Sequence, residues 1–193
     1  MPIWLVEVVN PMRISRYSRK LVPAALSLAV IMAGCASENA SETGRYHNDE
    51  VGFSIEFHPG WEVVEGDGYE YALVEAVSPW DGDDDEFAEH VSVDIEDVDG
   101  GTDLDSYHAE TIEAQAEAIP GFYIEEEGSM SIGGVPARYV VFGFESEGYP
   151  MTAIGYTLLK NGRGYLIAGL AQAHTFVLYR DVFQHTAASF RID

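Results

Sequence analysis

Alternating apolar and polar residues predict β-strands along most of the chain beyond residue 44. In segment 51–57, Val51, Phe53, Ile55 and Phe57 share one face, which is the pattern of a half-buried strand. Asn161-Gly162 separates two apolar runs and is a strong signal for a tight hairpin. Together with residues 51–57, the predicted strands cover residues 61–64, 69–77, 90–96, 122–124, 129–132, 137–145, 151–160 and 164–171.

Two segments change to a helical period. The first covers residues 104–119, after a Gly100-Gly101 break, with Thr102 or Asp103 as its N-cap. Its inner side is predicted to contain Leu104, His108, Thr111, Gln115, Ala118 and Ile119. The second covers residues 176–190, with an apolar face made of Phe176, Tyr179, Phe183, Thr186, Ala187 and Phe190. Its other side is predicted to contain Arg180, Asp181, Gln184 and His185. Strands joined by hairpins and covered by two amphipathic helices predict an α+β domain with a mainly antiparallel β-sheet.

Three motifs, in order and at suitable spacing, resemble PsbP-like domains. They are the 52–61 run GFSIEFHPGW, the 132–137 run IGGVPA, and the closing helix with Phe183 and Ser189-Phe190. The resemblance covers residues 45–193 and implies an antiparallel β-sheet sandwiched by helices. The named member of this family is an extrinsic subunit of photosystem II, but the fold also occurs in nuclear import factors and bacterial lipoproteins, so it does not fix a function. The family has no shared catalytic motif, so no active-site residue is implied.

The first 34 residues have the pattern of a secretory signal peptide. Residues 12–20 contain four basic residues and no acid, and residues 21–34 are apolar apart from Ser27. As a helix, this apolar run spans about 20 Å, which is short against a hydrocarbon core of about 30 Å. Residues 1–11 precede the basic segment, so Met12 is the predicted start of translation.

Cys35, the only cysteine, directly follows Ala33-Gly34, and this junction resembles a bacterial lipobox. The resemblance implies diacylglyceryl transfer to the Cys35 thiol, cleavage after Gly34 and further acylation, for example by palmitate, of the new amino terminus. Two or more acyl chains hold a protein stably on a membrane. Residues 35–44 would then form a flexible tether. The alternative is an ordinary signal peptide with an incidental cysteine.

The mature chain is strongly acidic. Only one of the 33 acidic residues precedes Cys35, but four of the ten basic residues do, so the remainder has 32 acids, six bases and a formal charge of −26. This charge argues against binding to nucleic acid or anionic lipid, which both need a cationic surface. It is compatible with a solvated surface, with adaptation to high salt or with cation binding.

The acidic loop that follows Trp80 is the clearest candidate for ligand chemistry. Asp81, Asp83, Asp85 and Glu86 offer oxygen ligands of the kind that Ca²⁺ prefers. The sixth position of a calcium loop requires glycine, however, and Glu86 occupies it here, so a solvated acidic loop is the favoured interpretation. His90 with Glu86 and Glu89 is a weaker zinc candidate, and Trp80 is either a partner contact or a side chain folded back on the sheet.

No catalytic constellation is visible in the sequence. No G-x-S-x-G elbow, phosphate loop or dinucleotide fingerprint occurs, and the single cysteine is assigned to the anchor. We therefore expect no enzymatic activity, no cofactor and no nucleic-acid partner. The predicted function is that of an extracytoplasmic binding or assembly protein of the cell envelope, anchored to the cell membrane or outer membrane through lipid at Cys35, with an envelope protein as partner. The alternative is a lipoprotein that binds a divalent cation or a small ligand.

Overall fold

The computed structural model describes residues 44–66, 72–80, 82 and 87–193. Residues 1–43, which include the predicted signal peptide, Cys35 and nearly all of the predicted tether, lie outside this range. Within the described part, neither helix has the length and apolarity needed to cross a bilayer.

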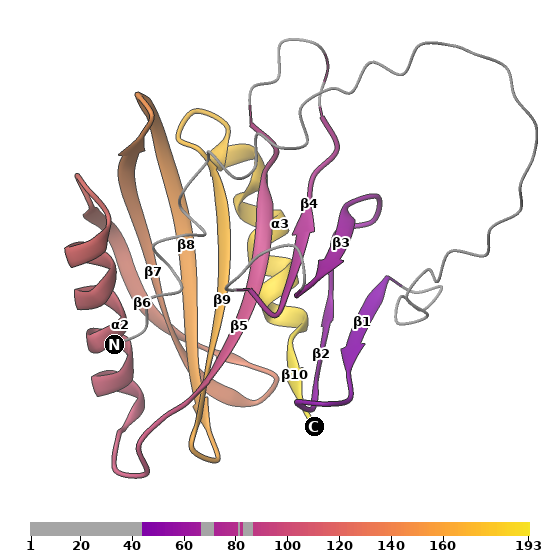
Figure 1. Ribbon diagram of the computed structural model, residues 1–193, viewed down its shortest axis with the longest axis vertical. Helices are drawn as coiled ribbons and strands as arrows, with labels where there is room; N and C mark the ends of the chain where they lie inside the picture. Colours follow the sequence, from indigo (N-terminus) through magenta and orange to yellow (C-terminus); the bar gives the residue numbers. More distant parts are fainter. Residues whose placement is uncertain (1–43, 67–71, 81, 83–86) are drawn as a thin grey trace, which may run out of the picture.

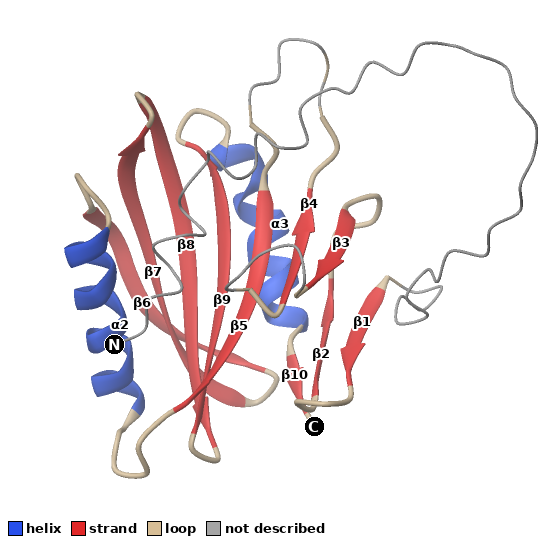
Figure 2. Ribbon diagram, in the orientation of Figure 1, coloured by secondary structure: helices blue, strands red, loops and turns tan. Residues whose placement is uncertain are grey.

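A seven-stranded antiparallel sheet forms the centre of the molecule (Figures 1 and 2). Its spatial order is β3-β4-β5-β9-β8-β7-β6, so β5 pairs with β9, far along the chain. This confirms the predicted fold class. The strands are β3 (Glu62–Glu65), β4 (Val74–Val77), β5 (His90–Asp97), β6 (Tyr123–Ile132), β7 (Val135–Ser146), β8 (Tyr149–Lys160) and β9 (Arg163–Gln172).

Three two-residue hairpins connect β6 to β9. Both residues of each turn have positive φ, with 58° and 80° at Gly133-Gly134, 52° and 86° at Glu147-Gly148, and 56° and 76° at Asn161-Gly162. Such turns match the right-handed twist of the strands that they join. The Asn161-Gly162 hairpin is as predicted.

A second, three-stranded sheet has the order β1-β2-β10. It consists of β1 (Arg45–Asn48), β2 (Phe53–Glu56) and β10 (Arg191–Ile192), so the two ends of the domain meet there. The alternation of residues 51–57 predicts the strand but not its separation from the main sheet. Inward-facing Phe53 and Ile55 are fully buried against the large sheet and the closing helix.

Two helices lie on opposite faces of the large sheet, which confirms the layered arrangement. Helix α2 (Leu104–Ala118) packs on β7 and β8, and the Asp103 carboxylate caps it by accepting from the Ser106 amide at 2.8 Å. Helix α3 (Phe176–Ser189) packs on β9, β8, β6 and β2 on the other face, where Phe183 and Phe190 are buried. The small sheet lies on the α3 side, so the main core lies between α3, the small sheet and the large sheet.

Candidate functional site

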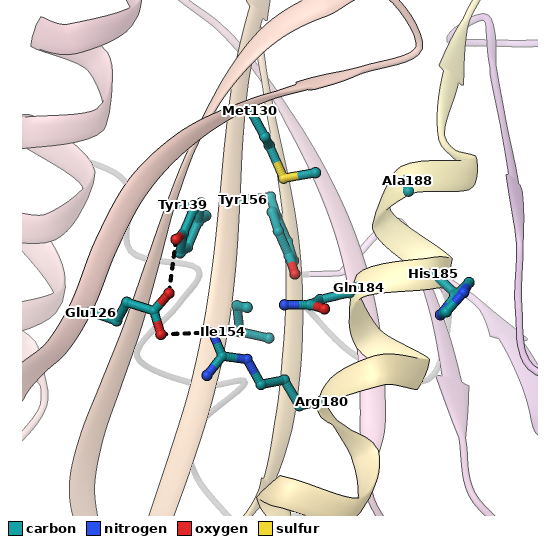
Figure 3. A pocket seen from close by; sticks show the side chains of 9 residues that line it. All are labelled: Glu126, Met130, Tyr139, Ile154, Tyr156, Arg180, Gln184, His185 and Ala188. Carbon is teal, nitrogen blue, oxygen red and sulfur yellow. Dashed lines mark hydrogen bonds and ion pairs between the residues drawn. The ribbon is translucent and has the colours of Figure 1, made fainter.

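A pocket of about 370 Å³ opens between α3 and strands β6, β7 and β8 (Figure 3). We call it the α3 pocket. Its floor is made of Ile154 and Tyr156, while Arg180 and Gln184 project from the helix. The remaining lining residues are Glu126, Met130, Tyr139, His185 and Ala188. The pocket therefore has an apolar floor and polar groups on its rim, as small-molecule sites usually do.

One carboxylate organises the polar side of the α3 pocket. Glu126 on β6 accepts a hydrogen bond from the Arg180 guanidinium at 2.6 Å and another from the Tyr139 hydroxyl at 2.8 Å. These two bonds hold the pKa of the Glu126 carboxyl below its usual range, the bond from Arg180 having the larger effect. Glu126 therefore stays ionised at neutral pH and holds Arg180 across the pocket.

The Tyr156 hydroxyl is the unsatisfied polar group of the α3 pocket. The side chain is 1% exposed, and its oxygen has no hydrogen-bond partner. Burial raises the pKa of Tyr156 well above its ordinary value, so the group stays a neutral donor. An unpaired buried hydroxyl is costly, and a ligand with an acceptor atom would satisfy it.

Replacing Tyr156 by phenylalanine tests whether this hydroxyl is unpaired. Because the oxygen makes no bond, we expect the free energy of unfolding of Tyr156→Phe to be unchanged or to rise by up to about 1 kcal/mol. Urea denaturation of the variant and the wild-type protein measures the difference. A loss of stability beyond about 1 kcal/mol would show that the hydroxyl has a partner in the folded protein.

The α3 pocket corrects one sequence prediction. Arg180 and Gln184 were expected on the side of the second helix that faces away from the core, but both are half-buried and line the pocket. Their positions follow the edge of the apolar face, where a helix side chain still reaches the sheet beneath it. The predicted apolar face is otherwise confirmed, since Phe176, Phe183 and Phe190 are buried.

A second feature is a group of exposed apolar side chains at one end of the large sheet, which we call the apolar end. At this end β4 finishes, β6 and β8 begin, and β9 passes into α3. Val177 and Leu178, in the first turn of α3, are 74% and 72% exposed, and Trp80 is 50% exposed. The apolar end consists of Trp80, Tyr123, Ile124, Tyr149, Val177 and Leu178.

Glu89 joins two segments of the apolar end. Its buried carboxylate accepts from the Ser78 hydroxyl at 3.2 Å and from the Thr175 hydroxyl at 2.9 Å. Ser78 lies two residues before Trp80, and Thr175 lies just before α3. The carboxylate therefore fixes the Trp80 segment relative to the start of α3. Trp80 is half exposed, so its side chain is not fully folded back on the sheet.

The predicted metal and lipid sites fall largely outside the described residues. Asp81, Asp83, Asp85, Glu86 and Cys35 all lie there, so the calcium and lipid assignments stay predictions. In the part of the chain that the structure describes, no three His, Cys, Asp or Glu side chains converge as metal ligands.

The two described histidines that were singled out from the sequence are both buried. The His90 Nε2 atom lies 3.5 Å from the Glu75 Oε1 atom, across the strand pair, whereas the Glu89 carboxylate binds Ser78 and Thr175. The structure thus gives no support to His90 and Glu89 as a pair of zinc ligands. His108 is a core residue, as predicted, and its Nδ1 atom lies 2.8 Å from the Thr157 hydroxyl.

No family model and no curated protein sequence matches the chain. Solved structures do match, at 10–14% sequence identity. LpqN, a Mycobacterium tuberculosis protein involved in cell envelope biogenesis, is 14% identical with a TM-score of 0.58, over 77% of this chain and 88% of its own. The cyanobacterial PsbP of Synechocystis is 14% identical with a TM-score of 0.56, over 77% and 91%.

The Ran-binding protein Mog1p of Saccharomyces cerevisiae is 10% identical with a TM-score of 0.52, over 77% of this chain and 94% of its own. At these identities the matches establish the fold but not the chemistry. They agree with the α+β arrangement expected from the PsbP-like motifs. The chain therefore has the Mog1/PsbP-like fold, which it shares with an envelope biogenesis protein, a cyanobacterial PsbP and a Ran-binding protein.

Proposed function

We propose that this chain is a lipid-anchored, extracytoplasmic, non-enzymatic protein of the cell envelope, and that it binds a protein partner through its apolar end. The observation that carries the proposal is the concentration of exposed Trp80, Val177 and Leu178 at one end of a strongly acidic protein. Large exposed apolar side chains surrounded by polar surface are typical of protein interaction sites. Tryptophan in particular often supplies a large share of the binding energy.

The chemistry of the α3 pocket supports binding over catalysis. Its carboxylate, Glu126, is held ionised by Arg180 and Tyr139, so it is a weak proton acceptor at neutral pH. The described lining contains no serine, threonine, cysteine or lysine that would act as a nucleophile. LpqN, which shares the fold, is involved in cell envelope biogenesis, and this favours an envelope role.

Cross-linking in intact cells tests the role of the apolar end. A photo-reactive residue placed at position 178 is expected to give a discrete cross-linked partner, because Leu178 is 72% exposed. The variant Trp80→Ser should weaken that cross-link at least about tenfold, as expected for an interface tryptophan. Val63→Ser, at another exposed apolar position, is the matched control and should leave the cross-link intact. Equal cross-linking in all three proteins would contradict the assignment of the apolar end.

Extraction of membranes tests the anchor separately. Wild-type protein is expected to stay on the membrane in a high-salt wash and to leave it in detergent, because acyl chains hold it there. Cys35→Ser removes the acceptor thiol, so this variant should not be recovered as a lipidated mature form. Release of the wild-type protein by salt alone would contradict the anchor, without bearing on the apolar end.

The α3 pocket favours a second candidate function, the binding of a small ligand. The unpaired Tyr156 hydroxyl and the half-buried Arg180 both offer donors, so the pocket suits a small ligand with an acceptor group and an apolar body. A thermal-shift screen of such compounds, with Tyr156→Phe as the comparison, tests this candidate.

The acidic loop after Trp80 is tested separately, by calorimetric titration with millimolar Ca²⁺. An absence of heat would contradict the hypothesis that this loop binds a divalent cation.

A further inference from the structure

A row of polar side chains lies on the face of the large sheet opposite α3. Alternation directs Val74, Ala76, Val91 and Val93 into the α3 core, so their neighbours on β4 and β5 face the other way. In the register of the two strands, Glu75 pairs directly with Ser92. We call the group of Glu75, His90, Ser92 and Asp94 the β4–β5 polar row.

All four side chains of the polar row are buried, and each has an atom without a hydrogen-bond partner. Glu75 is 4% exposed, His90 1%, Ser92 0% and Asp94 6%. The unpartnered atoms are Glu75 Oε2, His90 Nε2, Ser92 Oγ and Asp94 Oδ2. The 3.5 Å approach of His90 Nε2 to Glu75 Oε1 is an ion-pair distance without hydrogen-bond geometry. Four such atoms on two adjacent strands are exceptional, because buried polar groups are normally satisfied.

Apart from His90, whose Nε2 atom lies 3.5 Å from Glu75, no basic side chain of the protein pairs with the two carboxylates of the polar row. Six basic residues follow Cys35, and all lie in the described part of the chain. Arg45, Arg138, Arg163 and Arg180 pair with other carboxylates, and Lys160 and Arg191 donate to backbone carbonyl groups. Burial raises the pKa of Asp94 well above its usual range and also raises that of Glu75. Burial therefore disfavours the charged form of both acids, and a cation from outside the chain would compensate that cost.

We propose that the β4–β5 polar row binds a small organic cation, namely a short aliphatic amine or diamine whose ammonium groups contact Glu75 and Asp94. Each ammonium group donates three hydrogen bonds, which match the unpartnered oxygen atoms of the row. This site lies on the opposite face of the sheet from the α3 pocket and extends the function proposed above.

The spacing of the row favours a diamine over a metal ion. Glu75 is opposite Ser92, and Asp94 is two residues further along β5, so the two acidic residues are diagonal neighbours with Cα atoms about 7–8 Å apart. A metal ion needs its ligands to converge, and no three described His, Cys, Asp or Glu side chains do so. The two ends of a short diamine span a comparable distance.

Apolar side chains beside the row suit the aliphatic part of such a ligand. On β9, Leu170, Ala168 and Leu166 pair in register with His90, Ser92 and Asp94, and so present an apolar strip along the row. The Phe87 ring lies 5.7 Å from the His90 ring. An uncharged polar ligand would gain less at this site, because hydrogen bonds from a charged donor to a carboxylate are stronger than those from a neutral donor.

Calorimetric titration and thermal shift with diaminobutane test the proposal at pH 7.5 and constant ionic strength, on the purified protein. We expect saturable binding and a rise in melting temperature, since a ligand that binds only the folded state stabilises it. Butanediol, which has the same chain length and no charge, should give neither. The double variant Glu75→Gln, Asp94→Asn should weaken binding at least about tenfold, because it removes charge-assisted hydrogen bonds. This variant is expected to fold, since the amides relieve the burial of charge.

A surface variant separates specific binding from general screening of the acidic protein. Glu110→Gln, Glu113→Gln removes the same number of charges from exposed positions on α2 and should keep the response to diaminobutane. Equal responses of the two double variants would show that diaminobutane only screens charge, and would overturn the proposal. It would also be overturned if wild-type protein gave no binding at pH 7.5 but gained stability as the pH fell. In that case protons alone would neutralise Glu75 and Asp94. The other titratable groups that face these two acids are His90, Glu96 and Tyr107, and the Tyr107 hydroxyl donates a hydrogen bond to Glu96.

Discussion

Replacing Phe183 by alanine is expected to lower the free energy of unfolding by about 3–5 kcal/mol, the usual cost of truncating a fully buried phenylalanine. Phe183 is 1% exposed and lies where α3 meets β9. Its ring centroid is 6.1 Å from that of Phe176, 6.3 Å from Tyr179 and 6.4 Å from Trp61. The substitution therefore leaves a cavity bounded by three other rings, which cannot all move to fill it. Urea denaturation of the variant measures the loss.

Leu178→Ala on the same helix is the matched control for Phe183→Ala. Leu178 is 72% exposed, so its truncation should change the free energy of unfolding by less than about 0.5 kcal/mol. If the two variants lost similar stability, the assignment of the buried face of α3 would be wrong. The sequence places Phe183 on the apolar face of this helix, and its burial agrees with that prediction.

Replacing Gly169 by alanine is expected to cost roughly 2–3 kcal/mol, because it inserts a methyl group where no space exists. Gly169 lies in β9 directly under the Phe183 ring, and a Cβ atom there would overlap the base of that ring. The ring is held by its neighbours, so the strain cannot be relieved by moving the end of a flexible side chain. Thermal denaturation of Gly169→Ala should show a clearly lowered melting temperature.

Gly155→Ala, in the neighbouring strand β8, controls for the general effect of a glycine in a strand. A Cβ atom at Gly155 would lie 3.8 Å from a Val140 methyl group, which is ordinary contact, so this change should be neutral or stabilising. The double variant Gly169→Ala, Phe183→Ala provides a further check. If Gly169 is sensitive only because of the ring, the cost of Gly169→Ala should largely disappear once Phe183 is truncated. Additive losses would contradict this explanation.

Local patterns in the sequence were informative about single strands and turns. Alternation identified the long strands β5, β7, β8 and β9, and Asn161-Gly162 identified a hairpin, because both signals depend on residues close in the chain. Strand β6 was expected as two short strands, residues 122–124 and 129–132, but it is continuous over Tyr123–Ile132. The start of β4 was predicted less well: residues 69–77 were expected to form a strand, residues 69–71 lie outside the described part, and of residues 72–77 only Val74–Val77 form it. Local alternation also gave no indication that 53–56 belongs to a separate sheet closed by Arg191–Ile192.

The two ligand sites inferred from the structure were not accessible to sequence reasoning. Arg180 and Gln184 were assigned to the outer side of α3, and only the position of β6 beneath the helix turns Arg180 towards Glu126. Glu75 and Asp94 lie in different strands and carry no motif. The polar residues that alternate with apolar residues along β5 were visible in the sequence. Such residues usually face solvent, however, and whether a sheet face is buried depends on segments far away in the chain.

By itself, the sequence determined the α+β class, the amphipathic faces of both helices, the acidic charge and the prediction of an anchor at Cys35. Each of these depends on composition or on residues within a few positions of one another. Only the tertiary structure decided that β5 pairs with β9, that Glu126 meets Arg180 and that two acids lie buried without a lysine or arginine partner. The physical reason is that strand alternation sets the face that a side chain points to, while the neighbours on that face are set by pairing between segments far apart in the chain.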